Sequence, residues 1–265
     1  MSTILPSKWN SWLYEFSKKA QILFSRTEFE MTASGKRKVG TLHLDPTNFD
    51  TQLEQLTNRG LCFVPIFRSK RVEGFSHNLE IEDKIYKDTV VYGVISTNLE
   101  CAKEFRDLYK TKDSVISPDH RKIGDLLGYP SCCSSFFDEN FKDDKDPIFK
   151  MASNSDPASK NFCYKINNLV RENAIHLRYF GFRVIPWVPC SYYCGESLKY
   201  SKQWIDLMYE LDHDVTEKLL EILSTPGEFS LVNGQMLWKS DLFIGMCDAL
   251  EDYYIEPRRI TISGE

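Results

Sequence analysis

Apolar positions recur at helical spacing in some parts of the chain and alternate or run together in others. At residues 9–30 they fall three or four positions apart, which predicts an amphipathic helix. The next expected elements are strands at 38–44, 60–68 and 89–96, with a helix at 50–59. This order predicts a small α+β lobe over residues 1–98.

Helical patterns dominate the remainder, residues 99–265. The expected helices lie at 99–112, 118–127, 130–141, 156–180, 196–211, 215–223 and 241–250. Short strands are expected at 183–188, 229–231, 235–238 and 254–262. The whole pattern predicts an α+β protein in which the N-terminal α+β lobe packs on a mainly helical C-terminal lobe with short strands.

The composition narrows the classes of function. Hydrophobic residues make up 42% of the chain and charged residues 27%, which is typical of a folded globular protein. The formal net charge of -5 gives no basic field for nucleic acid or for an anionic membrane. No apolar run approaches the ~18 residues that cross a bilayer, and residues 1–21 lack the apolar core of a signal peptide. A cytoplasmic protein is therefore expected.

Four of the eight cysteines stand where a turn leads into an expected helix. Cys132 and Cys133 follow Gly128-Tyr129-Pro130-Ser131, whereas Cys190 and Cys194 lie in Pro189-Cys190-Ser191-Tyr192-Tyr193-Cys194. The first N–H groups of a helix are unpaired and carry partial positive charge, which lowers the pKa of a nearby thiol. These four thiols are therefore a candidate ligand set for a metal ion or an iron–sulfur cluster.

The spacing of the four cysteines differs from the paired C-x₂-C hairpins of a zinc ribbon. Neighbouring residues in the first turn of a helix can bind different metal atoms of a cluster. The pattern therefore favours a [4Fe–4S] cluster, with zinc as the alternative. Position 197 is Ser197, so the third cysteine of a radical-SAM loop is missing. The remaining cysteines are expected in the core as small apolar residues: Cys62, Cys101, Cys163 and Cys247.

The two motifs together resemble an uncharacterised family of archaeal and bacterial proteins with a Gly-Tyr-Pro-x-Cys-Cys stretch followed by Pro-Cys-Ser-x-x-Cys. The resemblance covers about residues 119–206. It implies no activity, and implies only that both motifs contribute to one site.

Further candidates surround these motifs. His176 and Glu196 are candidate acid/base residues, although the helix dipole alone favours a carboxylate at Glu196. Tyr129 and Tyr193 are candidate aromatic contacts for a cofactor. The sequence contains no P-loop, G-x-G-x-x-G, G-x-S-x-G or H-E-x-x-H motif, which removes the commonest nucleotide-binding, hydrolase and zincin functions.

Three hypotheses follow. The first is an enzyme with a cysteine-ligated metal centre that performs a biosynthetic or tailoring reaction on a small molecule or peptide. The second is a metal-free enzyme with Cys190 as thiolate nucleophile, and the third is a structural zinc protein that binds a partner. The sulfurs of Cys132 and Cys133 are expected to lie close to those of Cys190 and Cys194, near enough for at least three of them to share one centre. Residues 1–98 are expected to be unnecessary for metal binding, and Cys190 is expected to be the most sensitive position.

Overall fold

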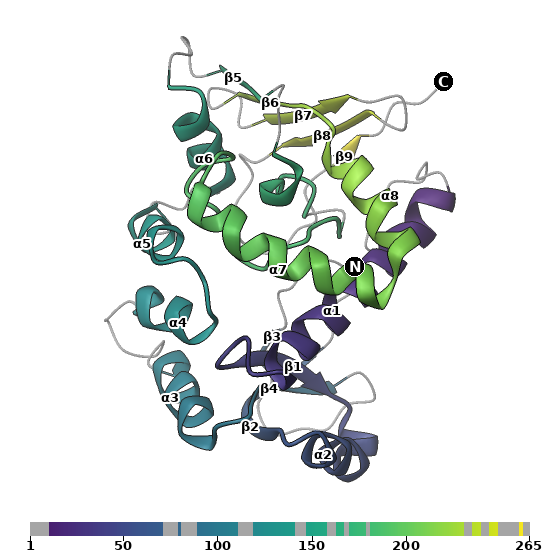
Figure 1. Ribbon diagram of the computed structural model, residues 1–265, viewed down its shortest axis with the longest axis vertical. Helices are drawn as coiled ribbons and strands as arrows, with labels where there is room; N and C mark the ends of the chain where they lie inside the picture. The colour runs from purple at the N-terminus through teal and green to yellow at the C-terminus, as the bar shows by residue number, and fades with distance from the viewer. Residues whose placement is uncertain are drawn as a thin grey trace. The chain divides into compact units, whose positions relative to one another are not determined.

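The structure is a computed structural model, and it forms two compact units (Figure 1). The sheet unit is Glu28–Ser131, and the cysteine unit combines Met1–Thr27 with Cys132–Glu265. The residues that the structure describes are 11–70, 79–80, 89–110, 119–140, 147–157, 163–166, 170–178, 181–230, 235–239, 244–248 and 260–261. Both units contain helices and an antiparallel sheet, so the predicted α+β class is confirmed.

A four-stranded antiparallel sheet in the order β1-β4-β2-β3 forms the centre of the sheet unit. Its strands are β1 (Gly40–Leu44), β2 (Cys62–Lys70), β3 (Leu79–Glu80) and β4 (Thr89–Ser96). The register of β2 on β4 shifts between Pro65 and Phe67. Proline cannot donate to the ladder, so an irregularity is the place where a strand tolerates it.

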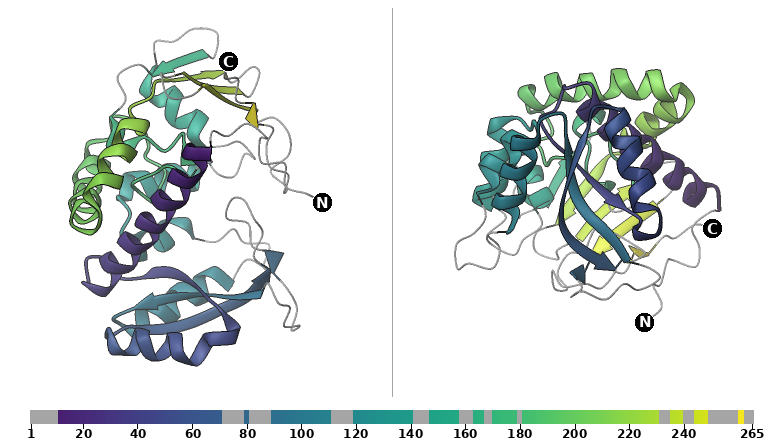
Figure 2. Two further views of the ribbon diagram at one scale, coloured as in Figure 1. Left: turned by 90° about the vertical axis from the view of Figure 1, so that its right-hand side faces the viewer. Right: turned by 90° about the horizontal axis from the view of Figure 1, so that it is seen from below.

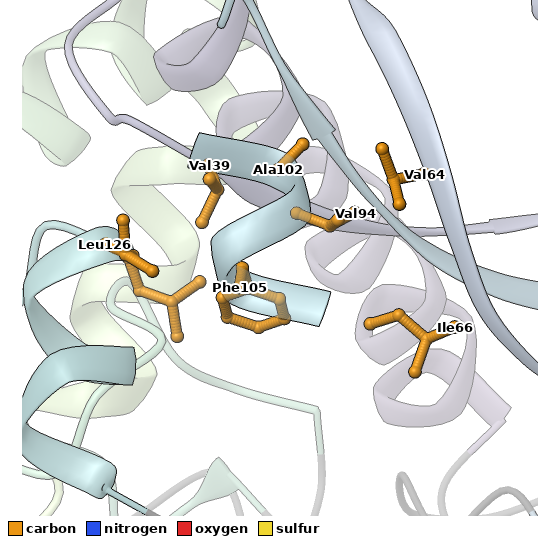
Figure 3. Packing of buried hydrophobic residues seen from close by; sticks show 8 residues of the cluster. Val39, Val64, Ile66, Val94, Ala102, Phe105 and Leu126 are labelled. Atoms are coloured by element: carbon orange, nitrogen blue, oxygen red, sulfur yellow. The ribbon is translucent and has the colours of Figure 1, made fainter. Parts of the chain in front are cut away.

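Helices cover both faces of this sheet. They are η1 (Pro46–Asn48), α2 (Phe49–Asn58), α3 (Leu99–Lys110), α4 (His120–Leu126) and the end of α1 (Ser11–Ala33). Val94 packs with Phe105 of α3 in one apolar cluster (Figure 3), whereas its neighbour Ile95 packs with Leu56 of α2 in another. Successive side chains of a strand point to opposite faces, which explains why adjacent residues join different clusters.

The cysteine unit has a five-stranded antiparallel sheet in the order β5-β6-β7-β8-β9 (Figure 2). Its strands are β5 (Cys163–Ile166), β6 (Gly227–Ser230), β7 (Gln235–Lys239), β8 (Ile244–Asp248) and β9 (Ile260–Thr261). Its helices are α5 (Ser131–Asn140), α6 (Pro147–Ser155), η4 (Arg171–Asn173), α7 (Gly195–Leu211) and α8 (His213–Leu223), together with the first part of α1.

The first part of α1 packs on segments far along the chain. The ring of Phe16 lies 6.0 Å from that of Phe182, and the ring of Phe24 lies 5.7 Å from that of Trp204. Gly181 has φ 83° and sits against the side chain of Gln21, so a side chain at position 181 would be strained and would collide with α1. Residues 11–27 therefore belong to the core of the cysteine unit.

The two units divide the chain differently from the boundary expected at residue 98. Residues 99–131 complete the sheet unit, because α3 and α4 cover one face of its sheet, and residues 11–27 complete the cysteine unit. A fragment that starts near Asn98 would lose apolar contacts of both units. It is therefore unsuited to testing whether the N-terminal residues are needed for metal binding.

Several expected elements of the cysteine unit are wrong. The segment expected as a helix at 156–180 contains β5 and η4, the one expected at 241–250 contains β8, and α6 was not expected. The described residues 181–194 have irregular backbone where a strand was expected at 183–188. Strands β5 and β8 have only four and five residues. The alternation of apolar and polar residues over such a short length does not outweigh the helical spacing of the surrounding sequence.

The expectation for the remaining cysteines also needs correction. Cys163 was expected in the core but is exposed on β5, where its neighbours Tyr164 and Ile166 point inward instead. Cys62 and Cys101 are half-buried at the edge of an apolar cluster. The side chain of Cys247 lies outside the described residues. None of the helices in the described ranges combines the length and apolar character that a membrane crossing needs.

Candidate metal centre

The predicted convergence of Cys132, Cys133, Cys190 and Cys194 is confirmed. Their four Sγ atoms all lie within 4.8 Å of one another, and together they could hold a metal ion. The Sγ of Cys194 lies 3.7 Å from that of Cys132 and 3.8 Å from that of Cys133. The Sγ atoms of Cys132 and Cys133 are 3.8 Å apart. No disulfide joins any of these four free thiols.

Two helix starts present these sulfurs, as the sequence predicted. Cys132 and Cys133 lie in the first turn of α5, and Cys194 is the N-cap of α7. The Sγ of Cys194 accepts a hydrogen bond from the backbone N–H of Ser197 at 3.4 Å. The backbone N–H of Cys190 likewise donates to the sulfur of Cys133. Both bonds stabilise negative charge on sulfur, as the helix dipoles do.

The four sulfurs differ in their access to solvent. Cys133 is 1% exposed and Cys194 is 8% exposed, so both are buried. Cys190 is half-buried, and Cys132 is the exposed member of the cluster. Solvent therefore reaches Cys132 and, in part, Cys190, whereas Cys133 and Cys194 are shielded from it.

Crowding makes the ionisation of one thiol depend on the others. The hydrogen bond from the Cys133 thiol lowers the pKa of Cys194 to about 5, and the same bond together with burial raises the pKa of Cys133. Burial raises the pKa of Cys190 to about 12 and also raises that of Cys132. One thiolate is thus stabilised by three neighbours that keep their protons. A cation at the centre would displace those protons and stabilise all four as thiolates.

The loop that carries Cys190 and Cys194, here called the cysteine loop (residues 181–194), is held by a buried asparagine. Asn173 of η4 is fully buried, and its Nδ2 donates to the carbonyl oxygens of Tyr192 at 3.1 Å and Cys194 at 3.3 Å. Its Oδ1 accepts from the hydroxyl of Ser197 at 2.7 Å. The same hydroxyl accepts from Trp187 Nε1 at 2.7 Å. Side chains therefore supply the hydrogen bonds that a regular strand would have provided.

Helix α6 adds two more contacts to the cysteine loop. Its Ser155 hydroxyl accepts from the backbone N–H of Tyr192 at 2.7 Å, and its Asn154 donates from Nδ2 to the carbonyl of Cys190 at 2.9 Å. Neither these two residues nor Asn173 was identified from the sequence. Asn173 directly follows the charged residues Arg171 and Glu172, so the local sequence pattern contains no signal that this amide is buried.

His176, a candidate acid/base residue, occupies a core position. It is fully buried, its Nε2 lies 3.2 Å from the carbonyl oxygen of Thr225, and its ring packs against Tyr192 and Phe229. Burial lowers its pKa to about 3, which keeps the imidazole neutral. This environment favours a structural role over proton transfer.

The other candidates lie at the surface or in the sheet unit. Glu196 is exposed and forms an ion pair of 2.6 Å with Lys199, one helical turn later. Tyr193 is also exposed, with 46% of its surface accessible. Tyr129 belongs to the sheet unit, where it packs on the apolar cluster of Phe105 and has the Arg37 guanidinium 5.9 Å from its ring.

Comparison with known proteins gives no further assignment: no family model, curated protein or solved structure matches the chain. The geometry of the four cysteines is therefore the feature that indicates a function.

Proposed function

We propose that the protein binds one zinc ion through Cys132, Cys133, Cys190 and Cys194, and that this ion fastens the cysteine loop to the start of α5. Zinc in structural sites is four-coordinate and tetrahedral, so four thiolates complete its coordination. Such a site leaves no position for a substrate or an activated water. The metal centre would act in folding, as in the third hypothesis, and any partner or substrate would bind elsewhere.

The sulfur–sulfur distances carry this proposal. A tetrahedron with zinc–sulfur bonds of about 2.3 Å has edges of about 3.8 Å. Three of the edges measured between Cys132, Cys133 and Cys194 are 3.7, 3.8 and 3.8 Å. Cys190 completes the set within 4.8 Å of the others. A small displacement of Cys190 would bring it to bonding distance of the same ion.

The same distances argue against the [4Fe–4S] cluster that the cysteine spacing favoured. The four thiolates of such a cluster bind four different irons, so their sulfurs stand roughly 6 Å apart. No sulfur pair of this site exceeds 4.8 Å. Widening every edge would require α5 and the cysteine loop to separate. A single ion needs no such movement.

Charge balance also supports a divalent cation. Four thiolates around one zinc ion leave a net charge of about -2 on the site. The N-terminal turns of α5 and α7 and the N–H groups of Ser197 and Cys190 place partial positive charge beside the sulfurs. Metal-free thiol catalysis by Cys190 finds less support, because His176 contacts Thr225 and Glu196 pairs with Lys199.

Elemental analysis of the purified full chain, expressed without added metal, tests the proposal. We expect one zinc per chain, no inorganic sulfide, and a cobalt-substituted protein with the visible bands of tetrahedral Co²⁺ and thiolate-to-cobalt charge transfer. Cys190→Ser should lose the metal, whereas Cys163→Ser, which alters an exposed cysteine of β5, should keep it. Iron with inorganic sulfide, or equal metal content in both variants, would contradict the proposal.

A further inference from the structure

We propose that the cysteine cluster is also a site of peroxide modification, in which Cys132 is oxidised first, forms a disulfide with Cys194 and so releases the zinc ion. This inference rests on the zinc site proposed above. It assigns the four thiolates different chemical roles, which the metal site alone does not require.

Exposure selects Cys132 as the point of attack. A peroxide must approach a thiolate sulfur directly, and among the four sulfurs Cys132 belongs to the exposed residue, whereas Cys133 and Cys194 are buried. Backbone N–H groups also donate to the sulfurs of Cys194 and Cys133, which draws electron density away from those two atoms. Burial and hydrogen bonding thus protect Cys133 and Cys194 from oxidation by peroxide.

Geometry selects Cys194 as the residue that completes the disulfide. Its sulfur lies 3.7 Å from that of Cys132. The sulfur of Cys133 is nearly as close to Cys132, at 3.8 Å. However, neighbouring Cα atoms are about 3.8 Å apart, and ordinary disulfides need about 4.4 to 6.8 Å. A bridge between adjacent residues is therefore unfavourable.

The reaction has two steps. The Cys132 thiolate attacks one oxygen of hydrogen peroxide, the O–O bond breaks, and a sulfenic acid and hydroxide form. The Cys194 thiolate then attacks the sulfenic sulfur, the S–O bond breaks, and a second hydroxide leaves as the disulfide forms. The two thiolates lose two electrons, peroxide gains them, and two protons from solvent convert both hydroxides to water. Cys133 and Cys190 then remain as the last two ligands, too few to retain zinc.

Loss of the ion has a local structural consequence. The cysteine loop keeps its hydrogen bonds to Asn173, but its metal link to α5 is replaced by a single disulfide at Cys194. Cys190 loses its metal link to α5 and retains two hydrogen bonds, from Asn154 to its carbonyl and from its own N–H to the sulfur of Cys133. The segment around Cys190 should therefore become the part of the loop most open to protease.

The test is a titration of the zinc-loaded full chain with hydrogen peroxide in the presence of a chromogenic zinc chelator. We expect loss of the bound zinc in parallel with a Cys132–Cys194 disulfide, mapped by alkylation and mass spectrometry. Dithiothreitol with added zinc should restore the starting state. Cys163→Ser should behave as the wild type. In Cys132→His, which removes the sulfur that peroxide attacks first, peroxide should no longer produce the first disulfide at Cys194.

The outcomes separate this proposal from the one on which it rests. A purified chain that neither contains nor takes up zinc overturns both. Two results would overturn only the proposed release of zinc by peroxide. In one, the zinc-loaded chain keeps its metal while peroxide oxidises other thiols; in the other, its first disulfide forms without Cys132. If Cys132→His fails to bind zinc, the disulfide map of the wild type decides the matter.

Discussion

The sheet of the sheet unit and the cysteine loop are two regions that reach a fixed structure by different means. In the sheet, Val94 is almost fully buried against Phe105 of α3 and other apolar side chains, and strand pairing satisfies the backbone. The cysteine loop has no regular backbone ladder. Its backbone bonds to the side chains of Asn173, Ser155 and Asn154, and its thiols meet at one point.

The difference concerns what a single substitution can do. The packing energy of the sheet is distributed over many apolar contacts. Truncating one side chain therefore removes only part of that energy. The cysteine loop depends on a few polar groups, each of which serves several partners. Removing one of them leaves buried polar atoms without hydrogen bonds or a metal without a ligand. Four changes to the protein or its conditions test this difference.

Removal of the proposed zinc ion should have the largest effect. Since binding of a structural metal is coupled to folding, extraction with a chelator should lower the free energy of unfolding of the cysteine unit by several kcal/mol. Denaturant melts of the zinc-loaded and zinc-free chain measure this loss. Equal midpoints for the two forms would mean that the cysteine loop does not depend on a metal.

Truncation of Phe105 should have the next largest effect, confined to the sheet unit. Its ring is 1% exposed within the apolar cluster, so Phe105→Ala should cost about 3–5 kcal/mol. The zinc content of the protein that still folds should stay the same, because the ligands all lie in the other unit. Calorimetry and metal analysis on one sample check both parts. Loss of zinc from the folded variant would contradict the contrast.

Asn173→Ala should come third and should act on the cysteine loop. It removes hydrogen bonds to Tyr192 and Cys194 and leaves their carbonyl groups buried, at a cost on the order of 2 kcal/mol. Zinc affinity should also fall, because Cys194 is no longer held in place. Asn154→Ala is the matched control, since this exposed amide makes one bond to the loop. Equal losses in both variants would argue against a central role for Asn173.

The pH dependence contributed by His176 should be the smallest effect over one pH unit. The pKa of the folded-state imidazole is about 3 against an ordinary value of 6.5, so the unfolded chain binds a proton more readily between these values. This contribution is present in full above pH 6.5, and stability falls by about 1.4 kcal/mol for each unit below it. His176→Gln should remove this slope, whereas acid release of zinc affects both proteins alike. Parallel pH profiles would contradict a buried neutral histidine.

The two regions also differ in how far the sequence predicted them. All three strands expected in the sheet unit and its helices α2 to α4 were found, because their apolar positions follow a regular period. The convergence of the four cysteines was also predicted, from their positions at helix starts. The cysteine loop has no such regular spacing of apolar residues. Its conformation is set by hydrogen bonds to side chains distant in the sequence, such as that from Asn173 to the carbonyl of Tyr192. The spacing of residues along the sequence does not predict such contacts.

The same reason explains why the preferred metal changed. Two cysteines that are adjacent in the sequence can bind either a single metal ion or an iron–sulfur cluster, so their position does not distinguish the two. The separation between Cys132 and Cys194 is a property of the folded chain, and its value of 3.7 Å matches the edge of a mononuclear site. The choice therefore required the tertiary structure.

X-ray absorption spectroscopy at the metal edge of the purified, metal-loaded full chain would identify the metal and its ligands. We expect a zinc spectrum with four sulfur neighbours at about 2.3 Å and no second metal atom nearby. An iron spectrum with an iron–iron shell would contradict it, as would a zinc spectrum in which nitrogen or oxygen replaces the sulfur of Cys132, Cys133, Cys190 or Cys194.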